Sequence, residues 1–413
     1  SMDPPPRRRR KVIAAFALLA IAAVGSFLIW RATSLRAIPE IGEPFDTKAF
    51  GTVNVPDEWN AFTYYRQAAA KFRDDLALGG PYFSWSQASQ RDREWLYANA
   101  EAMELWYVGT TMDRAVFIQP KDLRIDSSLD VVQSLRRMSR LAQLAGLRME
   151  AQGDLDEAWG WYRAGLRCSR HCGKNGGFID RLIGLNMYRQ MERPIRAWAE
   201  HPNQSPSSLR RALDEVITIN AMTPSMAENL RSEYFAFSGF LHEPDISLAK
   251  IELQIVESKT RPDLSPFGAM KESLWRLALR EPERSRRLIR VVWANWLSAA
   301  DLPVGERLGR GHKLPYGYFY DPPSDSPENV RTVAPGRINR WVGSTRYLRE
   351  MVPGIDNLDK AEGNEAAMRA ALVVELAEQL YLRENGHPPD SPDKLVGPYL
   401  KALPEGYVPP STR

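Results

Sequence analysis

The sequence predicts an all-α protein, an irregular stack of helical hairpins behind a single N-terminal transmembrane helix. Three observations predict this fold: an uncharged apolar run near the N-terminus, apolar residues that recur at helical spacing along most of the chain, and a near absence of alternating strand patterns. The chain has 413 residues, 44% of them hydrophobic and 26% charged, so it can bury a core and is not wholly disordered. Two cysteines in this length exclude a fold built from disulfides.

The first 30 residues predict a membrane anchor. Residues 12–30 carry no charge, and at about 1.5 Å per residue a helix of this length measures roughly 28 Å, close to the thickness of the bilayer hydrocarbon. The basic residues of the preceding tail, residues 1–11, predict that this tail stays in the cytoplasm and that the body is translocated; they are Arg7, Arg8, Arg9, Arg10 and Lys11. Trp30 is expected at the far interface. The alternative is a signal peptide cleaved after Ala23, Val24 and Gly25, which would deliver the body to the same compartment.

The charge of the body bears on its partners. Five of the 55 basic residues and one of the 51 acidic residues lie in residues 1–30, so residues 31–413 hold 50 of each. A nucleic-acid-binding protein needs a basic surface to displace counterions from phosphates. The neutral body therefore predicts no nucleic-acid partner.

The body divides into four predicted segments. Residues 31–55 contain prolines and glycines without periodicity and predict an extended tether. Residues 56–301 form a predicted helical-hairpin domain, with helices near 57–78, 86–108, 128–151, 154–172, 178–200, 206–241, 246–258 and 266–300. Residues 302–338 hold six prolines and five glycines and predict a loop. Residues 339–413 form a C-terminal helical segment, in which residues 363–384 predict a helix with one apolar face.

Four aromatic residues lie close together in the predicted loop: Tyr316, Tyr318, Phe319 and Tyr320. Aromatic side chains at this density usually bury against another surface. They predict either a strap that lies across the helices or a contact surface for a polypeptide or glycan. The second interpretation makes these four residues the candidate partner-binding site.

Cys168, His171 and Cys172 are the one local group of side chains with metal or redox chemistry. Positions 168 and 172 share a helix face, so the two cysteines could pack in the core, form a disulfide in an oxidising compartment, or supply part of a zinc site. No further Cys or His lies nearby in sequence to complete four ligands, so no metal site is predicted. The five histidines are thirty or more residues apart and no local catalytic motif occurs, so the catalytic residues are unknown and no cofactor is predicted.

Two passages of the chain resemble known groups of proteins. Gly146, Met149, Gly153, Ala158, Tyr162 and Gly165 have the spacing of one tetratricopeptide-like hairpin, and no second copy is in register. Residues 44–65, 141–190 and 281–297 together resemble a group of uncharacterised bacterial one-pass membrane-anchored helical proteins. This resemblance implies a protein of the bacterial inner membrane, with a cytoplasmic N-terminus and a periplasmic body, and it implies no activity.

Three functions are compatible with these patterns. The leading hypothesis is a membrane-anchored, exported helical scaffold or protein-interaction module without catalytic activity, whose partner is another exported protein. The first alternative is an envelope-acting hydrolase whose site is assembled from distant acids and histidines. The second is a secretion or pilus-associated component, because residues 381–404 resemble the segment that follows the long helix of pseudopilins.

Overall fold

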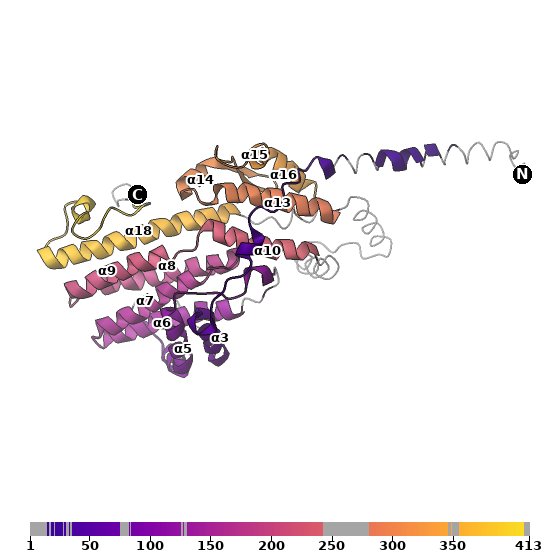
Figure 1. The fold of residues 1–413 in the computed structure, drawn as a ribbon. Helices are drawn as coiled ribbons and strands as arrows, with labels where there is room; N and C mark the ends of the chain where they lie inside the picture. The colour runs from indigo at the N-terminus through magenta and orange to yellow at the C-terminus, as the bar shows by residue number, and fades with distance from the viewer. Residues whose placement is uncertain are drawn as a thin grey trace, which may run out of the picture. The chain divides into compact units, whose positions relative to one another are not determined.

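The fold is predominantly helical, which confirms the predicted all-α class (Figure 1). It is described from a computed structural model, which covers residues 35–74, 84–124, 130–242, 281–345 and 355–408, together with residues 15, 18, 19, 21–27, 29, 33, 82, 127 and 348. The predicted helix at 246–258 lies outside the described residues, as do the flanking residues Arg7, Arg8, Arg9, Arg10, Lys11 and Trp30.

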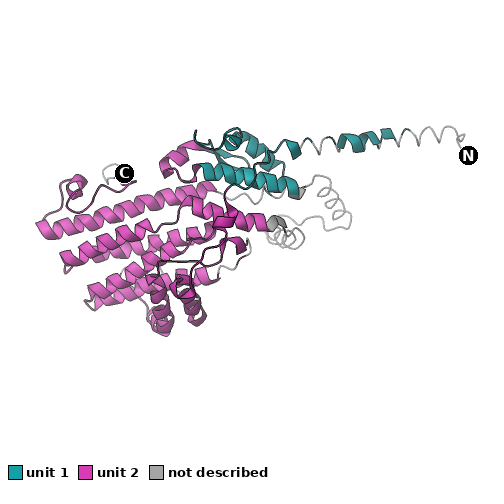
Figure 2. Ribbon diagram, viewed as in Figure 1, with its two compact units in different colours: residues 1–44, 240–298, 312–353 teal, residues 45–239, 299–311, 354–413 magenta. Residues whose placement is uncertain are grey.

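The chain forms two compact units, each assembled from separate stretches of sequence (Figure 2). The smaller unit comprises residues 1–44, 240–298 and 312–353. The larger unit comprises residues 45–239, 299–311 and 354–413. Each unit therefore combines residues from both sides of position 302, whereas the sequence predicted consecutive segments with boundaries at 301 and 338.

The larger unit is a stack of helices that pack both on their neighbours along the chain and on helices distant in sequence. The pairs in contact include α3 with α5, α6 with α7, α7 with α8, and α18 with both α8 and α9. The helices of this unit are α2 (Thr47–Phe50), α3 (Ala61–Lys71), α4 (Gln90–Ala98), α5 (Ala100–Thr111), α6 (Asp130–Ala151), α7 (Leu155–His171), α8 (Phe178–Glu200), α9 (Pro206–Ala221), most of α10 (Met226–His242), α14 (Val304–Arg310) and α18 (Ile355–Asn385).

Two predicted helices are each divided in the structure. The predicted helix 206–241 is α9 and α10, because Pro224 has no amide hydrogen and disfavours helical geometry at Thr223. The predicted helix 86–108 is α4 and α5, which meet at Asn99, a residue outside α-helical geometry with φ −106° and ψ 13°. Ser89 and Asp92 cap the start of α4 reciprocally, as in a capping box.

Helices α6 and α7 form the predicted helical hairpin. Gly153 has φ +83° in the connecting turn, and the Asp154 side chain accepts a hydrogen bond from the amide of Glu157 to cap α7. Gly146 lies directly against the ring of Tyr162, so a side chain at position 146 would overlap that ring. The close approach of the two helices therefore depends on this glycine.

Helix α18 is buried on more than the one face that the sequence predicts. Helices α8 and α9 both pack against it, and all five residues from Ala370 to Val374 are buried. The helix also begins at Ile355 instead of residue 363, and its extra N-terminal turns carry the buried acids Asp356, Asp359 and Glu362. The start of the helix could not be predicted from the sequence, because a segment rich in charged residues does not indicate a buried helix.

The smaller unit contains nearly all of α13 (Glu281–Ala300), nearly all of a two-stranded hairpin of β1 (Gly311–Leu314) and β2 (Gly317–Tyr320), α15 (Glu328–Arg331) and α16 (Pro335–Gly343). The predicted loop 302–338 thus contains regular structure. Asn295 of α13 stabilises the hairpin through two hydrogen bonds. Its side-chain amide donates to the carbonyl of Tyr320 at 2.8 Å, and its side-chain oxygen accepts from the amide of Tyr320 at 3.0 Å. The Trp296 indole donates to the carbonyl of Tyr318 at 2.8 Å.

The predicted tether, residues 31–55, is packed along much of its length. In the smaller unit Ile38 is fully buried, and Glu40 and Glu43 form ion pairs with Arg290 of α13. In the larger unit the ring of Phe45 meets that of Tyr234 edge-on, with centroids 5.4 Å apart. Apolar and acidic residues spaced between the prolines therefore bind this segment to the body.

The predicted anchor, residues 12–30, lies partly outside the described residues. Residues 21–27 are helical, and most of the large apolar side chains described in this part of the chain are exposed, while Phe27 is partly buried; the exposed ones are Leu18, Leu19, Ile21, Val24 and Ile29. Within the described parts of the chain, no helix combines the length and the apolar character that a membrane span requires.

Candidate functional site

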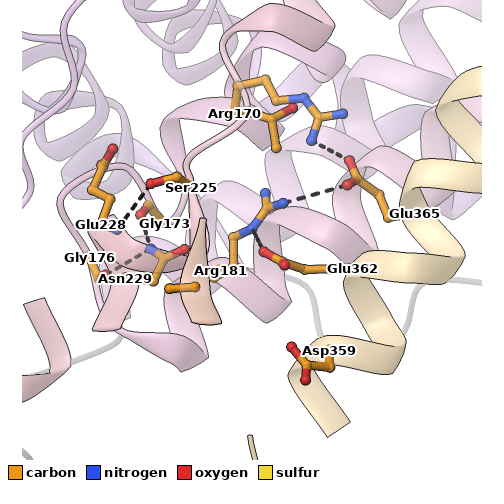
Figure 3. A network of polar contacts seen from close by, with 12 residues as sticks. Arg170, Gly173, Gly176, Arg181, Ser225, Glu228, Asn229, Asp359, Glu362 and Glu365 are labelled. Atoms are coloured by element: carbon orange, nitrogen blue, oxygen red, sulfur yellow. Dashed lines mark hydrogen bonds and ion pairs between the residues drawn. The ribbon is translucent and has the colours of Figure 1, made fainter. Parts of the chain in front are cut away.

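A buried ionic cluster joins four helices of the larger unit. We use this name for Arg170 of α7, Arg181 of α8, Arg307 of α14 and the α18 residues Asp359, Glu362, Glu365 and Arg369. Figure 3 shows Arg170 and Arg181 beside Glu362 and Glu365. Arg307 donates to Asp359 and to Glu362, each at 2.7 Å. Glu365 forms ion pairs with Arg170, Arg181 and Arg369. The nitrogen–oxygen distance is 3.5 Å for Arg181 and 3.3 Å for Arg369.

Several charged side chains of this cluster are almost fully buried. The side chains of Arg170, Arg181 and Glu365 are at most 1% exposed. Burial by itself raises the pKa of Glu365, but the neighbouring charges of Arg170, Arg369 and Arg181 outweigh burial and hold that pKa below its ordinary value. A buried carboxylate that remains ionised in this way ties its partners together, because separating them would leave uncompensated charge. The cluster therefore fixes α18 against α7 and α8.

Two acids with raised pKa values meet at the start of α8. Asp180 accepts from the amide of Gly177 at 3.1 Å, and Glu233 of α10 accepts from the amide of Phe178 at 3.0 Å. Burial raises the pKa of Asp180 to about 6 and that of Glu233 to about 7. Such a pair is a candidate for acid–base chemistry. Each carboxylate accepts from a backbone amide at the N-terminus of α8, so we assign both acids to capping this helix.

An open groove crosses α9. Its larger part has a volume of about 1330 Å³ and lies between α9, α18, residues 301–305 and residues 399–406. Its smaller part, about 330 Å³, lies between α5, α7 and α9. Asp214 and Thr218 of α9 line both parts, so the two hollows adjoin. We call them together the α9 groove.

The walls of the α9 groove are held by interactions with deeper residues. In the smaller part, Glu215 pairs with Arg163 at 2.8 Å and accepts from the indole of Trp159 at 2.5 Å. In the larger part, Arg369 donates to the hydroxyl of Thr223 at 2.8 Å and contacts Glu365 of the ionic cluster. The cluster thus fixes one wall of the groove.

The two predicted cysteines are both free and fully buried. The thiol of Cys172 lies 3.8 Å from the sulfur of Met187, and both cysteines belong to one apolar core. Nearby, Tyr65 Oη and His171 Nδ1 are 2.7 Å apart, and burial is the main cause that lowers the pKa of His171 to about 3. Among the described residues no group of His, Cys, Asp and Glu side chains is arranged to hold a metal ion.

The four predicted partner-binding aromatics are mostly inside the smaller unit. Phe319 and Tyr320 are fully buried and Tyr318 is 9% exposed, because β2 packs on α13 and α16. Tyr316 alone of the four is exposed, at 39%. The structure therefore places these aromatics as a strap across the helices and leaves one of them available to a partner.

Neither the ionic cluster nor the α9 groove was predicted from the sequence. One signal was available for the cluster, because Asp356, Asp359, Glu362 and Glu365 recur every third residue along α18. No local pattern marks the groove, since its lining comes from six separate stretches of sequence.

No protein-family model matches this chain, and neither a curated protein nor a solved structure shows significant similarity to it. A function must therefore be argued from the chemistry of the site.

Proposed function

We propose that this protein is a membrane-anchored, exported helical scaffold whose α9 groove binds an extended segment of another exported protein. The observation that carries the proposal is that the two hollows adjoin at α9, where Asp214 and Thr218 line both. A hollow that runs over successive helices offers contacts to a chain and not only to a compact molecule.

The dimensions of the groove support a polypeptide ligand. Small-molecule pockets usually enclose about 300–1,000 Å³ and bury most of their ligand. The larger part of the groove exceeds this range, at about 1330 Å³, before the adjoining hollow is added. Extended peptides are commonly held along such surfaces by a few apolar anchors and polar contacts.

The hairpin of α6 and α7 supports a scaffold related to helical repeats. Gly146 and Tyr162 occupy facing positions, as the packing residues of a tetratricopeptide-like hairpin do, and Gly165 lies against Met191 of α8. Repeats of this kind stack neighbouring hairpins and present a continuous binding surface. We infer that this hairpin is tetratricopeptide-like and that the other helices extend it irregularly.

The N-terminal region supports membrane anchoring. Residues 12–30 carry no charge, and most of the large apolar side chains described there are exposed, an arrangement favourable in lipid and costly in water. The five basic residues of the tail support a cytoplasmic N-terminus and a periplasmic body. Protease added to spheroplasts should digest the body, and added to inverted vesicles it should leave the body intact; the opposite pattern would reverse the orientation.

Site-specific photo-crosslinking in intact membranes tests partner binding. A photoreactive amino acid at Ile217, which lines the groove and is 43% exposed, should yield a discrete adduct with an exported protein. The matched control is Ile179 on α8, which is 55% exposed and does not line the groove. Equal labelling at both positions, or no adduct at Ile217, would count against the groove as the binding surface.

A further inference from the structure

We infer that the α9 groove selects an extended segment that carries lysine or arginine between apolar residues. This inference rests on the proposed function and adds the chemistry of the partner. It follows from the balance of charges that line the groove and from the exposed apolar positions between them.

Three carboxylates of the groove have no ion pair in the described structure: Asp214, Asp301 and Glu405. All three are exposed. One lysine of the lining, Lys401, is likewise exposed and without a described ion pair. Unpaired acids thus outnumber unpaired bases by three to one.

The arginines of the groove offset this excess only in part, because Arg163 and Arg167 are paired with acids and Arg369 shares Glu365 with Arg170 and Arg181. Arg163 binds Glu215, and Arg167 binds Asp113 at 3.0 Å as well as the carbonyl of Thr110. Arg369 contacts Glu365 of the ionic cluster and donates to Thr223. A ligand in the groove therefore meets a surface with an excess of negative charge, which favours cationic side chains.

Apolar side chains lie between the acids and supply the rest of the contact. Ile217 follows Asp214 by three residues on α9, which places the two on one side of the helix. Leu302, Pro303 and Val304 directly follow Asp301. A cationic ligand without apolar groups would leave these side chains exposed to water, so the favoured segment alternates basic and apolar residues.

Fluorescence anisotropy of the full-length protein in detergent tests this selectivity. Two labelled peptides of equal length share the same leucine positions and differ only in having lysine or glutamate between them. The lysine peptide should bind about tenfold more tightly at low salt, and the difference should shrink as the ionic strength rises. Equal affinity, tighter binding of the glutamate peptide, or no binding of either would overturn the inference.

Charge variants locate the effect in the groove. The double variant Asp214→Asn, Asp301→Asn should lower the affinity for the lysine peptide by about four- to tenfold, since each exposed ion pair contributes modestly to binding. Lys401→Gln should raise the affinity for the lysine peptide about twofold, a gain that general damage to the fold would not produce. Glu58→Gln removes an exposed carboxylate that does not line the groove, and it should leave both affinities unchanged.

The outcomes separate this inference from the proposed function. If Ile217 crosslinks a partner but the two peptides bind equally, the groove binds polypeptide without charge selection and the inference is wrong. If the lysine peptide binds as expected and the Asn double variant does not change its affinity, the binding lies elsewhere and the inference is also wrong.

Discussion

Replacing Glu365 by alanine should destabilise the larger unit strongly. The carboxylate of Glu365 serves Arg170, Arg181 and Arg369, and the first two of these guanidinium groups are almost wholly buried. Breaking one buried ion pair costs about 3–5 kcal/mol, because the remaining charge loses both water and its partner. Since two buried guanidinium groups lose their shared partner here, we expect a loss near the upper end of that range.

Urea unfolding of the full-length protein in detergent, followed by far-ultraviolet circular dichroism, measures this loss. The matched control is Glu378→Ala on the same helix, where the carboxyl is half-buried and has no described ion pair. The control should change the free energy of unfolding by less than about 1 kcal/mol. A loss below about 1 kcal/mol for Glu365→Ala would refute the role assigned to the cluster.

Two further measurements make the reasoning specific to charge. Replacing Arg170 by methionine and Glu365 by leucine together should recover part of the lost stability, since it removes the buried charge of Arg170, while Arg181 keeps Glu362 as a partner at 3.6 Å. The pKa of Glu365 is lowered in the folded state, so its stabilising contribution is present at neutral pH and is lost as the pH falls through that value. The difference between wild type and Glu365→Ala should therefore narrow in acid.

Three further predictions concern other parts of the fold. Gly146→Ala should lower the free energy of unfolding by about 1–3 kcal/mol through overpacking, whereas Gly305→Ala adds a methyl in open space and should be nearly neutral, as urea midpoints will show. Burial raises the pKa of Glu233 to about 7, so protonation stabilises the fold and this contribution is lost as the pH rises through 7. The thermal midpoint of Glu233→Gln should accordingly depend less on pH between 5 and 8. Asn295→Ala removes two hydrogen bonds to the backbone of Tyr320 and should cost about 1–3 kcal/mol, and limited proteolysis should cut β1 and β2 sooner than in wild type.

Local signals allowed the helices near α6, α7 and α8 to be predicted closely. The helix predicted at 178–200 coincides with α8, and that predicted at 128–151 begins two residues before α6. Turn and capping residues such as Gly153 and Asp154 fix these boundaries within a few positions of sequence. Such boundaries can be read from sequence because the interactions that set them are short-range.

The β-hairpin of residues 311–320 could not be predicted in the same way. Its strands have only four residues each, and a two-stranded hairpin is marginal by itself. Asn295 and Trp296 provide the missing hydrogen bonds from a helix that precedes the hairpin by more than ten residues. The prolines and glycines around it predicted a loop, because sequence does not show which distant side chain will satisfy a backbone amide.

The candidate site depends even more on distant contacts. Arg170 and Glu365 are 195 residues apart in sequence, and no local spacing relates them. The α9 groove likewise combines helices from the middle of the chain with the segment 399–406. Partner-binding residues were therefore predicted in the aromatic strap, where the local pattern was strongest, and not on α9.

The most direct test of a polypeptide-binding groove is the yield of the Ile217 photo-adduct when the groove is filled. Thr218 is exposed and lines both parts of the groove, so Thr218→Trp should occupy the space where they adjoin without disturbing the core. In intact membranes this variant should lose most of the adduct, while Ile179→Trp should retain it. An unchanged adduct in Thr218→Trp would contradict a partner bound across α9.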